Sequence, residues 1–122
     1  MNKVQLVGRL TKDVELSEFG KGKDKGAVCR GAIAVRDGID KDGNQLVQFI
    51  NFVAWNNTAN ILEGYTKKGD MIALAGRLTQ NDYTDEDGVK HYTLQVTVSE
   101  VELLPQGAKE EEKPQKGNKY RR

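Results

Sequence analysis

Residues 48–55 read Q-F-I-N-F-V-A-W, and this stretch decides the fold class that the sequence predicts. Its residues alternate with the two-residue period of a β-strand. One face of the strand is compact and apolar, as a core face should be, and holds Ile50, Phe52 and Ala54. The other face mixes two flat aromatic rings with an amide and holds Phe49, Asn51, Val53 and Trp55. The stretch predicts a strand with one core face and one face that displays rings.

Displayed rings indicate a binding surface. Aromatic side chains on an open sheet face are costly unless something covers them. In a small non-enzymatic domain, a nucleic-acid base is a common cover, because every base has a flat face on which a ring can stack. The alternative, which the stretch alone leaves open, is a strand buried on both faces.

Length and composition favour one soluble, mostly β domain. The chain has 122 residues, of which 37% are hydrophobic and 30% charged. No apolar run approaches the roughly 20 residues that cross a membrane. The N-terminus lacks a hydrophobic signal segment, so we expect the protein to remain in the cytosol. Thirteen glycines and short apolar runs indicate many turns.

The residue types argue against catalysis and against a bound metal or cofactor. Cys29 and His91 are the single cysteine and histidine of the chain. Cys29 is predicted to be a small core residue. The D-x-D-x-N pattern of residues 40–44 resembles a calcium loop, but it lacks the twelve-position spacing of an EF-hand. The acidic run at residues 82–87 is interpreted as a solvated hairpin tip with Tyr83 at its base. We predict no enzyme activity, no catalytic residue, no metal site and no cofactor.

The remaining chain predicts further strands and one helix. Strands are expected within residues 1–10 and over residues 27–36, 71–78 and 92–99, with bends at Gly8 and Gly76. Residues 17–26 are expected to form a Gly/Lys loop whose three lysines either touch phosphate or are simply solvated. In the strand at 27–36, the core face is predicted to hold Cys29, Gly31, Ile33 and Val35, and the outward face to hold Arg30 and Arg36. In the strand at 71–78, Arg77 is predicted to face away from the core.

A helix is expected directly after Trp55. Asn56 or Asn57 is predicted to cap it. Lys67 and Lys68 are expected near its negative end and Gly69 at its left-handed stop. Its spaced apolar and small residues are Thr58, Ile61, Leu62 and Tyr65. Five strands with a helix between the third and the fourth are the element order of an OB-fold barrel, an all-β fold.

Several sequence blocks together resemble the bacterial and phage-type single-stranded DNA-binding proteins. The resemblance covers residues 2–104 and rests on N-K-V at 2–4, L-V-G-R-L at 6–10, the strand at 49–55, Y-T-K-K-G at 65–69, G-R-L at 76–78 and the Tyr83 hairpin. It implies an OB-fold domain at residues 1–104. It also implies a homotetramer that wraps single-stranded DNA, without catalysis, in DNA replication, recombination and repair. The implied location is the bacterial cytoplasm or nucleoid, or the host cytoplasm if a phage encodes the protein.

The resemblance also implies site residues. Phe49, Trp55 and Tyr83 are similar to the base-stacking aromatics of the family, and Lys3 and Lys68 to its phosphate contacts. Asn51 lies where the family often has a basic residue. Ile39 falls where a further stacking aromatic is often found, so that platform is absent or displaced. The predicted DNA-binding residues are Phe49, Trp55, Tyr83, Asn51, Lys3, Arg30, Arg36, Lys68 and Arg77.

Charge divides the chain unevenly. Residues 1–104 carry 13 basic and 15 acidic side chains, and residues 105–122 carry six basic and three acidic ones. Overall charge therefore gives no support for nucleic-acid binding by the domain. The composition of residues 105–122 predicts a disordered tail. Its net charge of +3 is unlike the acidic tip through which family members recruit other proteins, so we expect no recruitment by that route.

Two other functions, a protein-binding adaptor and a hydrolase, are alternatives to nucleic-acid binding. An OB-fold adaptor would bury Phe49 and Trp55 against another protein, and the fold alone supports it equally well. A small nuclease or other hydrolase would need a constellation of His, Cys or carboxylate groups that the sequence does not offer. No membrane partner is expected.

Overall fold

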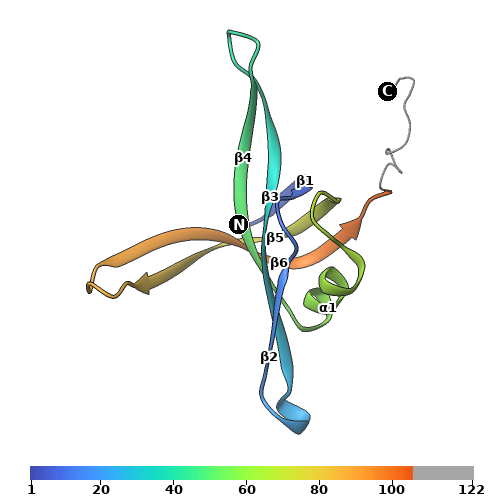
Figure 1. Ribbon diagram of the computed structural model, residues 1–122, viewed down its shortest axis with the longest axis vertical. Helices are drawn as coiled ribbons and strands as arrows, with labels where there is room; N and C mark the ends of the chain where they lie inside the picture. Colours follow the sequence, from blue (N-terminus) through green and yellow to red (C-terminus); the bar gives the residue numbers. More distant parts are fainter. Residues whose placement is uncertain (106–122) are drawn as a thin grey trace.

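The computed structural model describes residues 1–105, and these form a mostly β structure with one α-helix (Figure 1). The elements in chain order are β1 (Val4–Leu10), β2 (Glu15–Phe19), a short 3-10 helix (Gly22–Asp24), β3 (Gly26–Ile39), β4 (Gln45–Trp55), α1 (Asn56–Tyr65), β5 (Met71–Thr84) and β6 (Lys90–Leu103). The predicted all-β class and the single short helix between the aromatic strand and the next strand are confirmed.

Five of the strands close into a barrel. The sheet order is β1-β5-β6-β4-β3-β2. β1 also pairs with β3, and this pairing closes β1, β5, β6, β4 and β3 into a barrel and leaves β2 at its edge. The β4–β6 pairing is parallel, with Phe52 opposite Val96, and the other pairings are antiparallel. This closed five-stranded barrel with one helix is the predicted OB-fold.

A sixth strand, β2, lies outside the predicted set. The loop predicted for residues 17–26 is wrong at both ends, because β2 includes residues 17–19 and β3 begins at Gly26. β2 pairs with β3 from Glu15 opposite Arg30 to Phe19 opposite Gly26. Leu16 packs against the core and anchors this strand. Residues 20–25, which include the three lysines of the predicted loop, form the connection between the two strands.

The core is built around the ring of Phe52, which is 1% exposed at the centre of the barrel. Gly31 lies directly opposite it on β3, and a Cβ on Gly31 would lie 2.6 Å from Cζ of Phe52. Cys29 is fully buried, as predicted, and burial raises the pKa of its thiol. The other buried members of the core are Leu10, Ala27, Ile33, Ala54, Ala59, Leu62, Ile72, Leu74, Val96 and Val98.

Helix α1 packs against β3, β4 and β6 but differs from its prediction in detail. Its buried side chains are Ala59 and Leu62, whereas Tyr65 is exposed. No side chain caps its N-terminus, because the Asn56 amide oxygen accepts a hydrogen bond from the Ala27 N–H instead. The helix ends at Tyr65, so the predicted dipole partners Lys67 and Lys68 lie beyond it. Gly69 has the predicted left-handed conformation, with φ of +91°, but in the turn that leads to β5.

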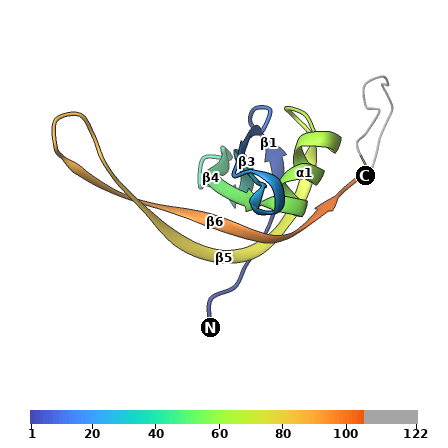
Figure 2. The same cartoon turned by 90° about the horizontal axis from the view of Figure 1, so that it is seen from below.

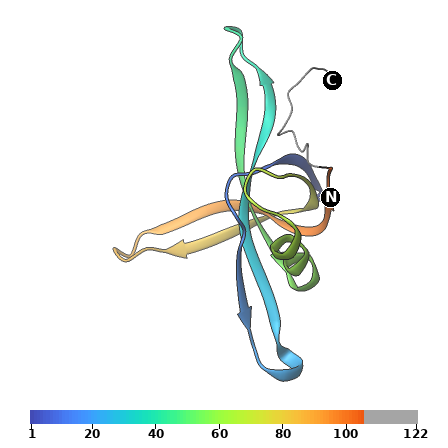
Figure 3. The same cartoon turned by 45° about the vertical axis from the view of Figure 1, so that its right-hand side comes forward.

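Three hairpins extend from the barrel in different directions (Figures 1 and 3). The β2–β3 and β3–β4 hairpins lie at opposite ends of the long axis, and the β5–β6 hairpin curves away to one side (Figure 2). Gly76 marks the bend of that third hairpin, as predicted: the β5–β6 register shifts between Ala75 and Gly76, where β6 carries one extra residue, Ser99. Gly8 instead marks a close approach, because a Cβ there would lie 2.5 Å from the Ala34 carbonyl oxygen.

A pair of glycine substitutions tests this packing. Gly76→Ala should lower the free energy of unfolding by about 1–3 kcal/mol, because its Cβ would collide with the backbone carbonyl of Thr97. The matched control is Gly64→Ala, in an open position inside α1. It should raise stability by about 0.5–1 kcal/mol through helix propensity. Urea unfolding of both variants measures this, and a neutral Gly76→Ala would contradict the packing described here.

Candidate nucleic-acid interface

The outer face of β4 displays the two predicted rings. Phe49 is 73% exposed and Trp55 45% exposed, and Asn51 between them is exposed as well. The predicted alternation of β4 is therefore confirmed. The alternative, a strand buried on both faces, is excluded because Phe49, Asn51 and Trp55 are exposed. Val53 is the exception, since it is only 3% exposed on the same face. Trp55 lies six positions after Phe49 along the strand, a span of about 20 Å.

Two arginines lie in the same cross-strand row as the buried Val53. Strand register places Arg30 beside Val53 on one side, and Thr97 beside it on the other. Arg77 is the next residue in the same row, opposite Thr97. Because residues opposite each other in a sheet point to the same face, Arg30 and Arg77 share the outer face with the rings. Both side chains are exposed.

The N-terminal segment is held against this region. The Asn2 amide donates to the Leu78 carbonyl at 2.9 Å and accepts from the Leu78 N–H at 2.8 Å. These two bonds hold the chain end beside β5, next to Arg77. Lys3 follows directly and is exposed.

A second pair of arginines lies in the strand rows next to Phe49, and the Arg9 guanidinium donates to the Gly69 carbonyl at 3.0 Å. Arg9 and Arg36 line a groove of about 600 Å³ whose other lining residues include Ala34 and Val47. Ala34 pairs with Arg9 on β1 and with Phe49 on β4, so the groove adjoins the Phe49 ring. Arg36 belongs to the predicted set. Arg9 was missed, because its sequence neighbourhood shows only a strand, and its closeness to Arg36 depends on barrel closure.

Tyr83 lies on the β5–β6 hairpin, 51% exposed and stacked on His91 with ring centroids 4.8 Å apart and planes 14° apart. The Asp85 carboxylate lies 2.8 Å from Nε2 of His91 and accepts the Asp87 and Val89 N–H groups of the turn. The hydrogen bond from His91, followed by that from Val89, lowers the pKa of Asp85 below its ordinary 3.8. His91, which was not predicted as a site residue, thus covers one face of the Tyr83 ring.

Lys68 stands apart from the β4 rings. It lies in the segment between α1 and β5, where its N–H donates to Asp13 at 2.7 Å. Asp13 follows β1, and the neighbouring Thr11 N–H donates to Ala32 on β3. Ile39 is 69% exposed near the tip of the β3–β4 hairpin, so an aliphatic side chain is displayed there.

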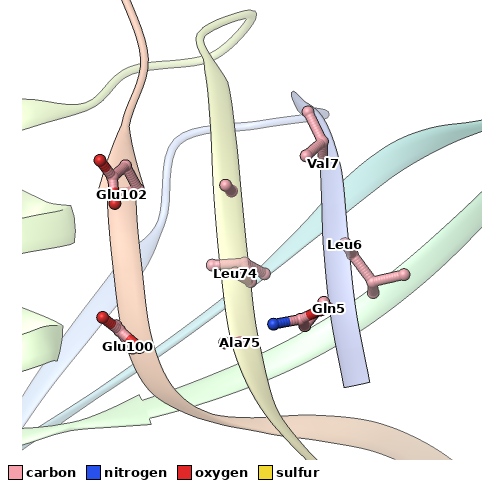
Figure 4. Close-up of a pocket in the computed structure, with 8 residues that line it drawn as sticks. Gln5, Leu6, Val7, Leu74, Ala75, Glu100 and Glu102 are labelled. Carbon is pink, nitrogen blue, oxygen red and sulfur yellow. The ribbon is translucent and has the colours of Figure 1, made fainter. Parts of the chain in front are cut away.

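A different hollow of about 300 Å³ lies on the β1–β5–β6 face (Figure 4). Gln5 and Val7 line one side, and Glu100 and Glu102 of β6 line the other. The two carboxylates make this hollow unsuitable for phosphate. Within residues 1–105, no group of three or more His, Cys, Asp or Glu side chains is placed to hold a metal ion. No helix in that part of the chain is long and apolar enough to span a membrane.

Comparison with known proteins places the chain in a family. A family model described as the single-strand binding protein family matches residues 1–104. The chain belongs to this family. The single-stranded DNA-binding protein of Clostridium tetani is 37% identical over 120 residues, which cover 98% of this chain and 81% of that protein. Single-stranded DNA-binding protein 3 of Clostridium acetobutylicum is 37% identical over 108 residues, 88% of this chain and 74% of that protein. Single-stranded DNA-binding protein 1 of Streptococcus pyogenes is 35% identical over 105 residues, 85% of this chain and 78% of that protein.

The Asp85 carboxylate generates a pH prediction. Because its pKa is lowered in the folded hairpin, its stabilising contribution is present above the ordinary carboxyl pKa of 3.8 and is lost as the pH falls below that value. The ring stacking of Tyr83 on His91 should weaken over that acid range, which NMR ring-current shifts of the two side chains would report. Asp85→Asn should remove this acid transition. The control is Asp87→Asn, which has the same charge change in the same turn, and identical profiles for the two variants would contradict the assignment.

Proposed function

We propose that this chain binds single-stranded DNA with little sequence preference. Bases stack on Phe49, Trp55 and Tyr83, and phosphates contact the exposed basic residues of the same region. The observation that carries the proposal is the exposure of two aromatic rings on one face of β4 in an OB-fold barrel. The names of the family and of the similar proteins support it.

Single strands fit this surface better than a duplex. Stacking on an aromatic ring needs the open face of a base, and a base inside a duplex is already stacked on its neighbours. The sequence tolerance follows from the same physics, because every base offers a π-face. Asn51 lies between the two rings and is the amide best placed on β4 to reach a base edge or the backbone.

The charge distribution supports phosphate contacts despite the net acidic domain. Arg30 and Arg77 share the ring-bearing face, and Arg9 and Arg36 lie together beside Phe49. The exposed carboxylates Glu100 and Glu102 line the separate β1–β5–β6 hollow, away from the row that holds Arg30 and Arg77. Binding is therefore expected to weaken with salt, because each neutralised phosphate releases counterions.

The biological setting is part of the same proposal. The protein acts in the cytoplasm, in DNA replication, recombination and repair, as a non-catalytic homotetramer. Residues 1–104 are the DNA-binding domain. The predicted charged tail at 105–122 lies outside the described residues apart from Pro105, and the expectation that it recruits no protein through an acidic tip stays a prediction.

The test is fluorescence titration with oligo-dT. Trp55 is the single tryptophan of the chain, so its emission reports directly on the proposed platform. Oligo-dT should quench it in a salt-dependent manner, and duplex DNA of the same length should compete weakly. An adaptor that buries the same rings against a protein should show no quenching, and equal competition by duplex would refute the preference for single strands.

A matched pair of aromatic substitutions separates stacking from simple surface exposure. Phe49→Ala should cost about 1–3 kcal/mol of binding free energy, roughly a 5- to 150-fold loss of affinity. Tyr65→Ala is the control, because Tyr65 is 74% exposed, like Phe49, but lies on α1. It should bind oligo-dT like the parent. Thermal unfolding of both variants shows whether either change disturbs the fold.

A further inference from the structure

Phe19 extends the aromatic surface beyond Trp55. The two rings lie with centroids 5.9 Å apart and planes at 79°, and each is 45% exposed. Phe19 pairs with Gly26 at the end of β2, and its ring lies across Gly26, where a Cβ would collide with it. Val28, two residues along β3 from Gly26, is opposite Trp55, so Phe19 shares the outer face of the sheet with Trp55.

The β2–β3 hairpin tip next to Phe19 is basic. Residues 20–26 have a net charge of +2, because they contain three lysines (Lys21, Lys23 and Lys25) and one acidic residue, Asp24. Lys25 lies 3.8 Å from Glu18, whereas Lys21 and Lys23 are exposed and make no ion pair with any residue of the described chain. These two ammonium groups are free to contact phosphate.

The other two hairpin tips have the opposite sign. Residues 37–44 carry three aspartates against Lys41, a net charge of −2. Residues 82–90 carry three aspartates and a glutamate against Lys90, a net charge of −3. The three tips point in different directions from the barrel, so their fields do not cancel locally (Figure 1). A polyanion that follows β4 therefore meets a favourable potential beyond its Trp55 end, at the β2–β3 tip, and an unfavourable one beyond its other end, at the β3–β4 tip.

We propose that the single strand bound along β4 leaves the Trp55 end over the β2–β3 hairpin. Phe19 stacks a further base there, and Lys21 and Lys23 contact the phosphates that follow. The near-perpendicular rings require the strand to turn between Trp55 and Phe19, because bases stacked on the two rings lie in different planes. The inference rests on the proposed function. It adds the path that the bound strand takes beyond Trp55 and a second binding element, the β2–β3 hairpin.

Substitutions at Phe19 test the stacking step. Phe19→Leu keeps an apolar side chain over Gly26 but removes the π-face, and it should weaken oligo-dT binding roughly tenfold. Phe19→Tyr retains the ring and should bind like the parent. Parent-like binding by Phe19→Leu would overturn the stacking role. Equal weakening by Leu and Tyr would also overturn it, since the aromatic face would then be irrelevant.

Paired lysine substitutions test whether the bound strand leaves over the β2–β3 hairpin. Lys21→Gln with Lys23→Gln should reduce the slope of log affinity against log salt by about 1.4, or 0.7 for each lost phosphate contact on a single strand. The control, Lys41→Gln with Lys90→Gln, removes the same charge from the two acidic hairpins and should change the slope little. Both pairs are exposed, so neither threatens the core. Equal slopes for the two pairs would overturn the proposed exit over the β2–β3 hairpin.

The parent protein separates this inference from the proposed function. If oligo-dT fails to quench Trp55 in the parent, the proposed function itself fails. If the parent is quenched and the Phe19 and lysine variants match it, single-strand binding stands and only the path over the hairpin is refuted.

Discussion

The packing of the Phe52 ring over Gly31 sets the orientation of the whole candidate surface. A strand has a two-residue side-chain period, so the face taken by one residue fixes the face of every other. Phe52 fills the centre of the barrel because Gly31 opposite it has no Cβ. With Phe52 inward, Phe49 and Trp55 must point outward. A shift of one residue in β4 would bury those rings and expose the core.

Barrel closure brings basic side chains from several strands next to the rings of β4. Pairing of β1 with both β5 and β3 brings Arg9 next to Arg36, and the β4–β6 pairing places Arg77 in the same row as Arg30. The formal charge of the domain is therefore a poor guide to its partner. What matters is that basic groups gather where the rings are displayed, while acidic groups occupy the β1–β5–β6 hollow and two hairpin tips.

The same barrel sends its strands out into three arms, and each arm adds something different. The register shift at Gly76 turns β5 and β6 away from the body, so that Tyr83 lies on a separate arm with His91 against one face of its ring. The β3–β4 arm ends in an acidic turn whose Asp40 accepts the Asp42 and Asn44 N–H groups. These bonds, that from Asn44 above all, lower the pKa of Asp40. The β2–β3 arm alone carries a basic tip.

The sequence by itself determined the fold class, the core face of β4 and the outward placement of Phe49 and Trp55. Periodicity and glycine positions are local signals, and they were sufficient for these features. It missed β2, the true end of α1, the burial of Val53 and the contacts of Phe19 and Arg9. Those features depend on which strand edges meet and on what lies above each side chain. Phe19 and Trp55 are far apart in the chain and meet only because β2 and β4 flank β3. No local window of sequence encodes that adjacency, so the tertiary structure alone decided it.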